Sequence, residues 1–118
     1  MYAPAKIMTF SARNFGSTQE EILATFEKKL KELQNTTMDL LCFPEEFLIS
    51  SADRDNPNAV ANYRRVLELS REYAAKLHTN VVVSVMEESE DYPGFHYNTA
   101  YLLDRTGAII GKSRDAYR

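Results

Sequence analysis

Two adjacent carboxylates, Glu45 and Glu46, follow a short apolar run in this sequence, with Pro44 between the run and the acids. Residues 39–43 read DLLCF, a pattern typical of a strand covered on both faces, and Pro44 cannot donate to a sheet, so the strand should end there. A carboxylate at the end of a buried strand is partly withdrawn from water, which favours its use as a general base. Glu45 and Glu46 are therefore the first candidates for chemistry.

Other ionisable residues are better explained without a metal. Glu46, Asp53 and Asp55 offer the oxygen ligands that hard cations prefer, but the last two lie in a segment rich in Ser, Asp and Asn that is typical of an acidic loop. His78 and His96 have no second His or Cys at ligand spacing, so solvated or capping roles are expected. No metal site is predicted.

Composition excludes several classes of function. The 118 residues are 44% hydrophobic and 26% charged, which fits one globular domain over residues 1–118. The net charge is -3 and Arg64-Arg65 is the densest basic cluster, so nucleic acid is not an expected partner. No stretch approaches the roughly 20 apolar residues of a membrane span, and a cytoplasmic location is predicted. Cys42 is the single cysteine, which excludes an intrachain disulfide and favours a small buried hydrophobe.

The first elements must bring the Glu45 strand into a sheet. Residues 6–12 predict a strand, and Ser17 and Glu20 have the spacing of a capping box that starts a helix. Apolar residues then recur on one helical face up to Leu33, and Asn35 and its neighbours end the helix before the strand at 39–43.

The second half of the chain predicts a long helix and three strands. Apolar residues, Tyr63 and Tyr73 among them, recur every three or four positions over 59–77, with Asn56-Pro57 as the expected cap and first helical residue. Strands are expected at 81–86, 97–103 and 108–114. The last two should form a hairpin, because Gly107 in the turn 104–107 supplies a positive φ.

This order, βαβαβββ, predicts an α/β fold in which two helices pack on one face of a mixed sheet. In such sheets ligand-binding residues tend to lie just beyond the carboxyl ends of the strands, where Glu45 and Glu46 are expected. A flavodoxin-like binding domain would use the same geometry, but the sequence lacks a Gly-rich phosphate loop.

Three segments together carry a family resemblance. DLLCFPEEFL resembles the Pro-Glu segment that closes the second strand in the nitrilase, or carbon-nitrogen hydrolase, superfamily. REYAAKLHTNVVVSVMEES is similar to that family's helix leading into a strand that ends in Glu, and HYNTAYLLDRTGAIIGKSR is similar to its Tyr-Asn-Thr-Ala strand, turn and Gly-Lys-Tyr-Arg strand. The resemblance covers about the amino-terminal half of a family domain, and implies half of an αββα sandwich, an incomplete domain.

The resemblance implies roles for individual residues. Family members hydrolyse amide or nitrile C-N bonds with a Glu, a Lys and a Cys, and Glu45 matches the general base. Asp115 stands at the position of the lysine, where it is not expected to function, and Lys112 should face the opposite way along a strand. Glu87 and Asn98 match residues that are structural near the site.

Two interpretations remain open for the function. The resemblance implies an enzyme acting on small amides or nitriles without a cofactor, since the chemistry needs only side chains and water. The family's nucleophilic cysteine follows the next strand, beyond Arg118, and Cys42 cannot replace it, so the chain should be inactive alone. The alternative is a truncated or degenerate homologue that acts as an interaction or oligomerisation module. Alternate residues of 81–86 and 97–103 would then form an uncovered apolar sheet face, which predicts self-association.

Overall fold

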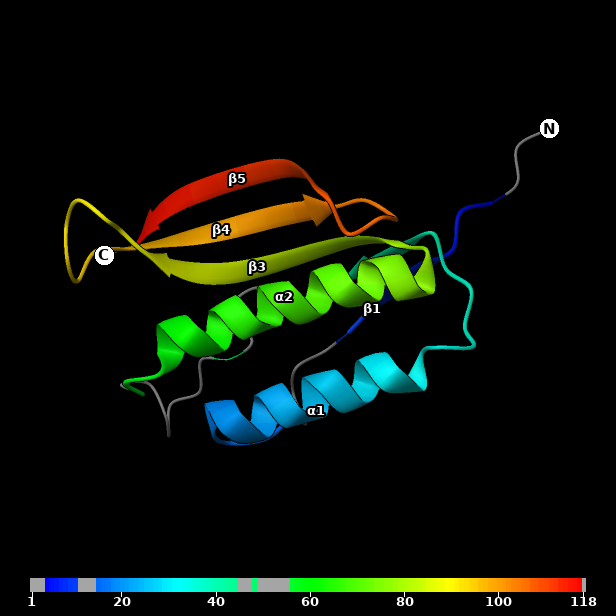
Figure 1. Cartoon of the computed structure of the whole chain (residues 1–118), viewed down its shortest axis with the longest axis horizontal. Helices are drawn as coiled ribbons and strands as arrows, with labels where there is room; N and C mark the ends of the chain where they lie inside the picture. Colours follow the sequence, from blue (N-terminus) through cyan, green and yellow to red (C-terminus); the bar gives the residue numbers. More distant parts are fainter. Residues whose placement is uncertain (1–3, 11–14, 45–47, 49–55, 118) are drawn as a thin grey trace.

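A computed structural model describes residues 4–10, 15–44, 48 and 56–117. The elements in chain order are β1 (Ile7–Thr9), α1 (Gln19–Glu32), β2 (Leu40–Cys42), α2 (Ala59–Leu77), β3 (Asn80–Glu88), β4 (His96–Leu103) and β5 (Ile109–Tyr117). Figure 1 shows α2 running beside β3, with α1 next to α2. The order βαβαβββ is the one predicted from the sequence, and the fold is α/β.

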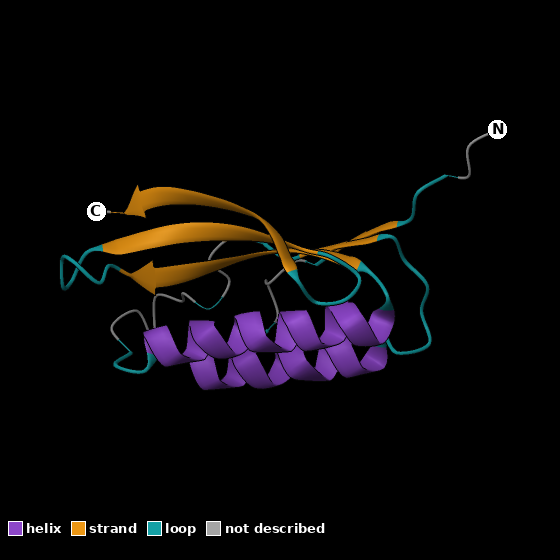
Figure 2. Cartoon of the chain, turned by 45° about the horizontal axis from the view of Figure 1, so that its top comes forward, coloured by secondary structure: helices purple, strands orange, loops and turns teal. Residues whose placement is uncertain are grey.

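The five strands form one mixed sheet in the order β1-β2-β3-β4-β5. The helical crossovers make β1, β2 and β3 parallel, and the two shorter, helix-free connections make β3, β4 and β5 antiparallel. Both helices lie on the same side of this sheet (Figure 2). The prediction of two helices on one face of a mixed sheet is therefore confirmed.

The two sides of the sheet differ because side chains alternate along each strand. Val81, Val83 and Val85 are buried against the helices. We call the other side the helix-free face. Its members are the even-numbered residues of β3 and β4 from 82 to 102, residues 111, 113 and 115 of β5, Ile7 and Thr9 of β1, and Leu40 and Cys42 of β2.

The hydrophobic core lies between the helices and the sheet. Phe26 and Leu30 of α1 and Tyr63, Val66 and Leu69 of α2 are almost fully buried there. Each such side chain contributes about 1.5–3 kcal/mol by leaving water, so this layer supplies most of the driving force for folding. Tyr73 is also buried, as the helical spacing predicted.

Both helices begin later than the sequence predicted. Thr18, not Ser17, caps α1: its hydroxyl accepts the Glu21 N–H at 3.1 Å, and the Glu21 carboxylate accepts the Ser17 N–H at 3.1 Å. The cap is thus shifted by one residue, and Glu20 instead accepts a hydrogen bond from Asn56.

The start of α2 is shifted for a related reason. The Asn56 side chain accepts the Asn58 N–H at 2.8 Å, and this local turn places Pro57 before the helix rather than inside it. Asn58 is the N-cap, and Ala59 is the first helical residue. At the other end His78 adopts a left-handed conformation with φ 49° and caps α2, as expected of a capping role.

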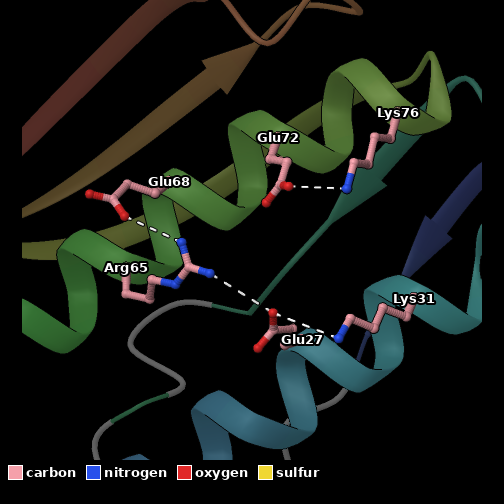
Figure 3. A network of polar contacts seen from close by, with 6 residues as sticks. All are labelled: Glu27, Lys31, Arg65, Glu68, Glu72 and Lys76. Carbon is pink, nitrogen blue, oxygen red and sulfur yellow. Dashed lines mark hydrogen bonds and ion pairs between the residues drawn. The ribbon is translucent and has the colours of Figure 1, made fainter.

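The outer surface of the helices is charged and internally paired (Figure 3). Arg65 of α2 contacts Glu27 of α1 at 3.8 Å and Glu68 at 3.4 Å. Glu27–Lys31 and Glu72–Lys76 pair along the helices. This pattern is typical of a surface that faces water. Neither helix in the described part of the chain is apolar over enough turns to cross a lipid bilayer.

Candidate active site

The candidate site is built at the carboxyl end of β2. Beyond Cys42, the Phe43 N–H still donates to the Val82 carbonyl at 3.0 Å, and then Pro44 ends the pairing. The Phe43 ring stacks on Phe10 at 5.5 Å and meets Phe26 edge-on at 4.8 Å. These aromatic contacts fix the end of the strand, because aromatic pairs stabilise beyond the area they bury.

Several predicted site residues lie outside the described residues. Glu45 and Glu46 follow Pro44 directly in the sequence, and Asp53 and Asp55 belong to the same connection between β2 and α2. The role of Glu45 as general base therefore stays a prediction. Its support is the position of the preceding residue, Pro44, at the end of the strand.

Asp115 lies on the helix-free face, directly opposite Asn98 of β4. The Asp115 side chain is exposed, whereas Asn98 is only 6% exposed. The pairing of β4 with β5 is regular over the four pairs from Asn98–Asp115 to Tyr101–Lys112. The register shift lies outside these pairs, between Leu102 and Leu103 of β4. Lys112 and Asp115 consequently lie on opposite faces, and no bulge turns Lys112 toward the helix-free face.

Glu87 lies on the helix side, where it joins three strands. Its carboxylate accepts the Tyr101 hydroxyl at 2.8 Å and lies 3.4 Å from the Arg114 guanidinium and 3.9 Å from the Lys112 ammonium. The two cations also lie over aromatic rings, Arg114 over Tyr97 at 4.8 Å and Lys112 over Tyr101 at 5.4 Å. Glu87 therefore holds β5 against β3 across β4.

The surroundings of Glu87 change two pKa values. Burial works to raise the pKa of the Glu87 carboxyl, whereas hydrogen bonds from Thr99 and Tyr101 lower it. The charges of Lys112 and Arg114 lower it further, and the pKa of Glu87 ends below its ordinary value. Burial and the hydrogen bond to Glu87 raise the pKa of Tyr101 to about 12.

The two residues predicted to be structural near the site are thus brought to different faces, Glu87 to the helix side and Asn98 to the helix-free face. Sequence reasoning missed the partners of Glu87. The signal was present in the sequence. Tyr97 and Tyr101 are four residues apart and Lys112 and Arg114 are two apart, so each pair lies on one face of its strand in the predicted hairpin.

An open cavity of about 380 Å³ lies between the first turns of α2 and the end of β3. It is lined by Val60, Arg64 and Leu67 of α2 and by the segment from Val85 to Glu90. In the part of the chain that the structure describes, no three His, Cys, Asp or Glu side chains gather as metal ligands. Cys42 is half-buried on the helix-free face.

The fold and this strand-end position define an α/β protein with a mixed sheet covered by helices on one side and a candidate site beyond β2. The sequence model of the carbon-nitrogen hydrolase family matches residues 11–116. The chain belongs to the carbon-nitrogen hydrolase family, and the resemblance to the nitrilase superfamily is confirmed. The comparison with curated protein sequences gave no significant match.

Solved structures of a carbon-nitrogen hydrolase and of amidases share this fold. A carbon-nitrogen hydrolase from Helicobacter pylori G27 superposes with a TM-score of 0.69 at 15% identity, over 94% of this chain and 38% of that one. An amidase from Nesterenkonia sp. gives a TM-score of 0.64 at 17% identity, over 92% of this chain and 41% of that one.

An N-terminal amidase solved with a Gln-Gly peptide gives a TM-score of 0.65 at 15% identity, over 94% of this chain and 27% of that one. The chain therefore spans less than half the length of these solved structures.

Proposed function

We propose that this chain supplies the general-base part of a site that hydrolyses C-N bonds of small amides or nitriles, with Glu45 as the base. The observation that carries the proposal is the family match over residues 11–116 on a fold in which the hydrogen-bonded pairing beyond β2 stops at Pro44, the residue before Glu45 in the sequence. Amidases among the structural neighbours favour an amide substrate for this chain.

In the proposed reaction Glu45 takes the proton of a cysteine thiol, and the thiolate attacks the amide carbon. The amine leaves with a proton, and water then cleaves the thioester to release the acid and regenerate the thiol. Cys42 is the single cysteine and lies within β2, before Glu45, so the nucleophile has to come from outside residues 1–118.

Asp115 sets a second limit on this activity. A carboxylate at the position of the family's lysine cannot stabilise a developing oxyanion, and loss of one such group typically costs about 10² to 10³ in rate. Lys112 is engaged with Glu87 on the other face. We expect the chain by itself to show no turnover.

The deciding measurement is the reading frame after the codon for Arg118, together with the mass of the intact protein from its source. The proposal expects the frame to continue into a segment that carries a cysteine after a strand, and that longer protein should release ammonia from small amides in a manner abolished by Glu45→Gln. A stop codon after Arg118 and a mass of 13.5 kDa would contradict it.

A matched assay uses the 118-residue chain. Ammonia release from a panel of small amides should equal the buffer background for the chain and for its Asp115→Lys variant, because both lack the nucleophile. If the chain showed turnover and Glu45→Gln abolished it, the chain would use another nucleophile. The prediction that the isolated chain is inactive would then be wrong.

A second candidate function is that of an interaction module that pairs with another chain. The observation that favours it is the helix-free face, on which Leu102 is 37% and Ile7 is 62% exposed. No element of the described chain packs on this side of the sheet (Figure 2). An apolar sheet face open to water is typical of a surface that another layer covers.

A further inference from the structure

Among the described residues, His96 is the only side chain on the helix-free face that can carry a positive charge. Lys112 and Arg114 of β5 are directed to the helix side, where Glu87 engages both of them. The other members of the face are glycine or have apolar, hydroxyl, thiol, amide or acidic side chains. A reaction on this face that needs a cation from the described chain therefore has to use His96.

His96 lies at the end of the sheet where β2 stops, because it is the first residue of β4. β3 runs on past the level of Pro44 to Glu88, which is the residue paired with His96. The Ser89 N–H donates to the Phe95 carbonyl at 2.8 Å and closes this pairing, so the backbone of His96 is held in the sheet. The side chain is half-buried, a more fixed position than the solvated or capping role expected from the sequence.

Two acidic residues flank His96 on its own face. Glu88 lies directly opposite on β3, and Cβ atoms of such pairs are about 4.5–5.5 Å apart. Asp115 of β5 is a diagonal neighbour, because it pairs with Asn98, two residues along β4, and such neighbours are about 7–8 Å apart. His96 therefore lies beside the position at which the proposed reaction lacks a cation.

Glu88 is placed to orient the imidazole. Its carboxylate accepts the Gly94 N–H at 3.2 Å, which holds it at the end of the hairpin, and a carboxylate has further lone pairs for a second donor. A hydrogen bond from one ring nitrogen of a histidine to a carboxylate fixes which way the other nitrogen points. With Glu88 accepting from one nitrogen of His96, the other can donate to a bound substrate.

We propose that His96 stabilises the oxyanion of the proposed reaction, in place of the lysine for which Asp115 stands. This inference rests on the proposed hydrolysis of small amides and adds one catalytic residue to it. When the thiolate attacks, the C–S bond forms, the electron pair of the carbonyl π bond moves to oxygen, and an N–H of His96 donates to that oxygen. His96 keeps its proton throughout, while Glu45 carries the thiol proton to the leaving amine.

Two neutral donors on the same face are weaker candidates. The Asn98 side chain is only 6% exposed, and Ser113 pairs with Ala100, two residues further from the strand end than Asp115. Hydrogen bonds in which both partners are neutral are also roughly half as strong as those with a charged partner. His96 is better placed than either, and it can donate as a cation.

Kinetics of the longer protein expected under the proposed function test this role. His96→Gln should lower kcat for small amides by about 10² to 10³ and leave KM within about threefold, because the interaction is made only in the transition state. His78→Asn is the matched control. His78 lies before β3, at the opposite end of the sheet, and asparagine tolerates the left-handed cap, so neither constant should change.

Rescue by lysine separates a catalytic role from a structural one. His96→Lys keeps a cation at this place and should retain a kcat within about tenfold of the unmodified protein. A residue that only supports the fold would gain nothing from the positive charge, and His96→Lys would then be as impaired as His96→Gln. Circular dichroism checks that every variant is folded.

Asp115→Lys gives an independent test of the same assignment. It supplies a cation on the neighbouring strand of the same face, so His96 becomes dispensable. In this background His96→Gln should lower kcat by less than about threefold, since two groups with one role are not additive. An equal loss on His96→Gln with aspartate and with lysine at position 115 would overturn the shared role.

The remaining outcomes distinguish this inference from the function on which it rests. Turnover that Glu45→Gln abolishes and His96→Gln leaves unchanged would overturn the role of His96 and leave the hydrolytic function standing. A longer protein that turns over none of the amides would contradict the proposed function, and the role of His96 with it.

Discussion

Glu87 and Asp115 show at the scale of single residues how the same sheet separates two kinds of acid. Glu87 is directed to the helix side, where a tyrosine hydroxyl and two cations satisfy it. Asp115 lies on the helix-free face and is exposed. The first acid stabilises the fold, whereas the role of the second in the proposed site stays a prediction.

Glu87→Gln should destabilise the chain by about 1 kcal/mol, because glutamine can still accept from Tyr101 but offers no charge to Arg114 and Lys112. The figure allows for the partial exposure of all three charged side chains. Urea denaturation measures it. Glu90→Gln, an exposed position in the loop after β3, is the control and should change stability by much less.

The effect of Glu87→Gln depends on pH. Since the pKa of Glu87 in the fold lies below its ordinary value of 4.5, its stabilising contribution is complete above the unfolded value and disappears as the pH falls through the folded one. The difference in unfolding free energy between the two proteins should be full at pH 7 and vanish in strong acid. A difference that grows toward acid would contradict the assigned direction.

Sequence alone identified the strand end at Pro44, since a proline after an apolar run is a local signal. The spacing of tyrosines and cations gave only a partial signal for the partners of Glu87, because Arg114 and Lys112 reach Glu87 only after the register of two hairpins is set. That register includes the shift between Leu102 and Leu103, which no local residue pattern predicts.

Helix caps are the features that matter most at the scale of elements. Thr18→Ala should cost about 1 kcal/mol, because the Thr18 hydroxyl satisfies the Glu21 N–H at the start of α1. Ser17→Ala is the matched control. Ser17 donates its backbone N–H to the Glu21 carboxylate at 3.1 Å, which alanine keeps, and alanine loses only the longer hydroxyl contact at 3.5 Å, so the cost should stay below about 0.5 kcal/mol. Thermal unfolding of both variants decides whether Thr18 or Ser17 is the cap.

The β4–β5 turn gives a second prediction for an element. Gly107 has φ +84°, and a Cβ atom there would lie 2.5 Å from the carbonyl oxygen of Arg71 in α2. Gly94 has nearly the same φ of +85° but open space around it. Gly107→Ala should therefore cost about 1 to 3 kcal/mol more than Gly94→Ala, the excess reporting the contact with α2. Equal costs in urea denaturation would show that the turn moves away freely.

The sequence predicted every helix and strand of the described chain in the right order. The apolar repeat over 59–77 is a strong helix signal, and the β-branched run at 81–86 is a strong strand signal. The helix starts were wrong by one or two residues. At both starts adjacent polar residues compete for the same backbone groups, and only the tertiary contacts, such as Glu20 with Asn56, decide between them.

The whole molecule is asymmetric, with a charged helical surface on one side and the helix-free face on the other (Figure 2). The second candidate function predicts self-association through that face, so folding and association should be linked, and the melting temperature should rise with protein concentration. Leu102→Glu should remove this dependence while Ile109→Glu keeps it. Scanning calorimetry over a range of concentrations measures it, and a constant melting temperature for the unmodified chain would contradict the link.

The strand pairings differ greatly in length, and this difference has a consequence for the order in which the sheet opens. β2 is held by three residue pairs on each side, whereas β3 and β4 share eight, formed between neighbours in sequence. Short pairings closed by long crossovers open at lower cost than local hairpins. Amide hydrogens of β1 and β2 should therefore exchange before those of β3 and β4. The segment leading to Glu45 thus belongs to the cooperative unit that is released first, while the hairpins remain as the last structure to unfold.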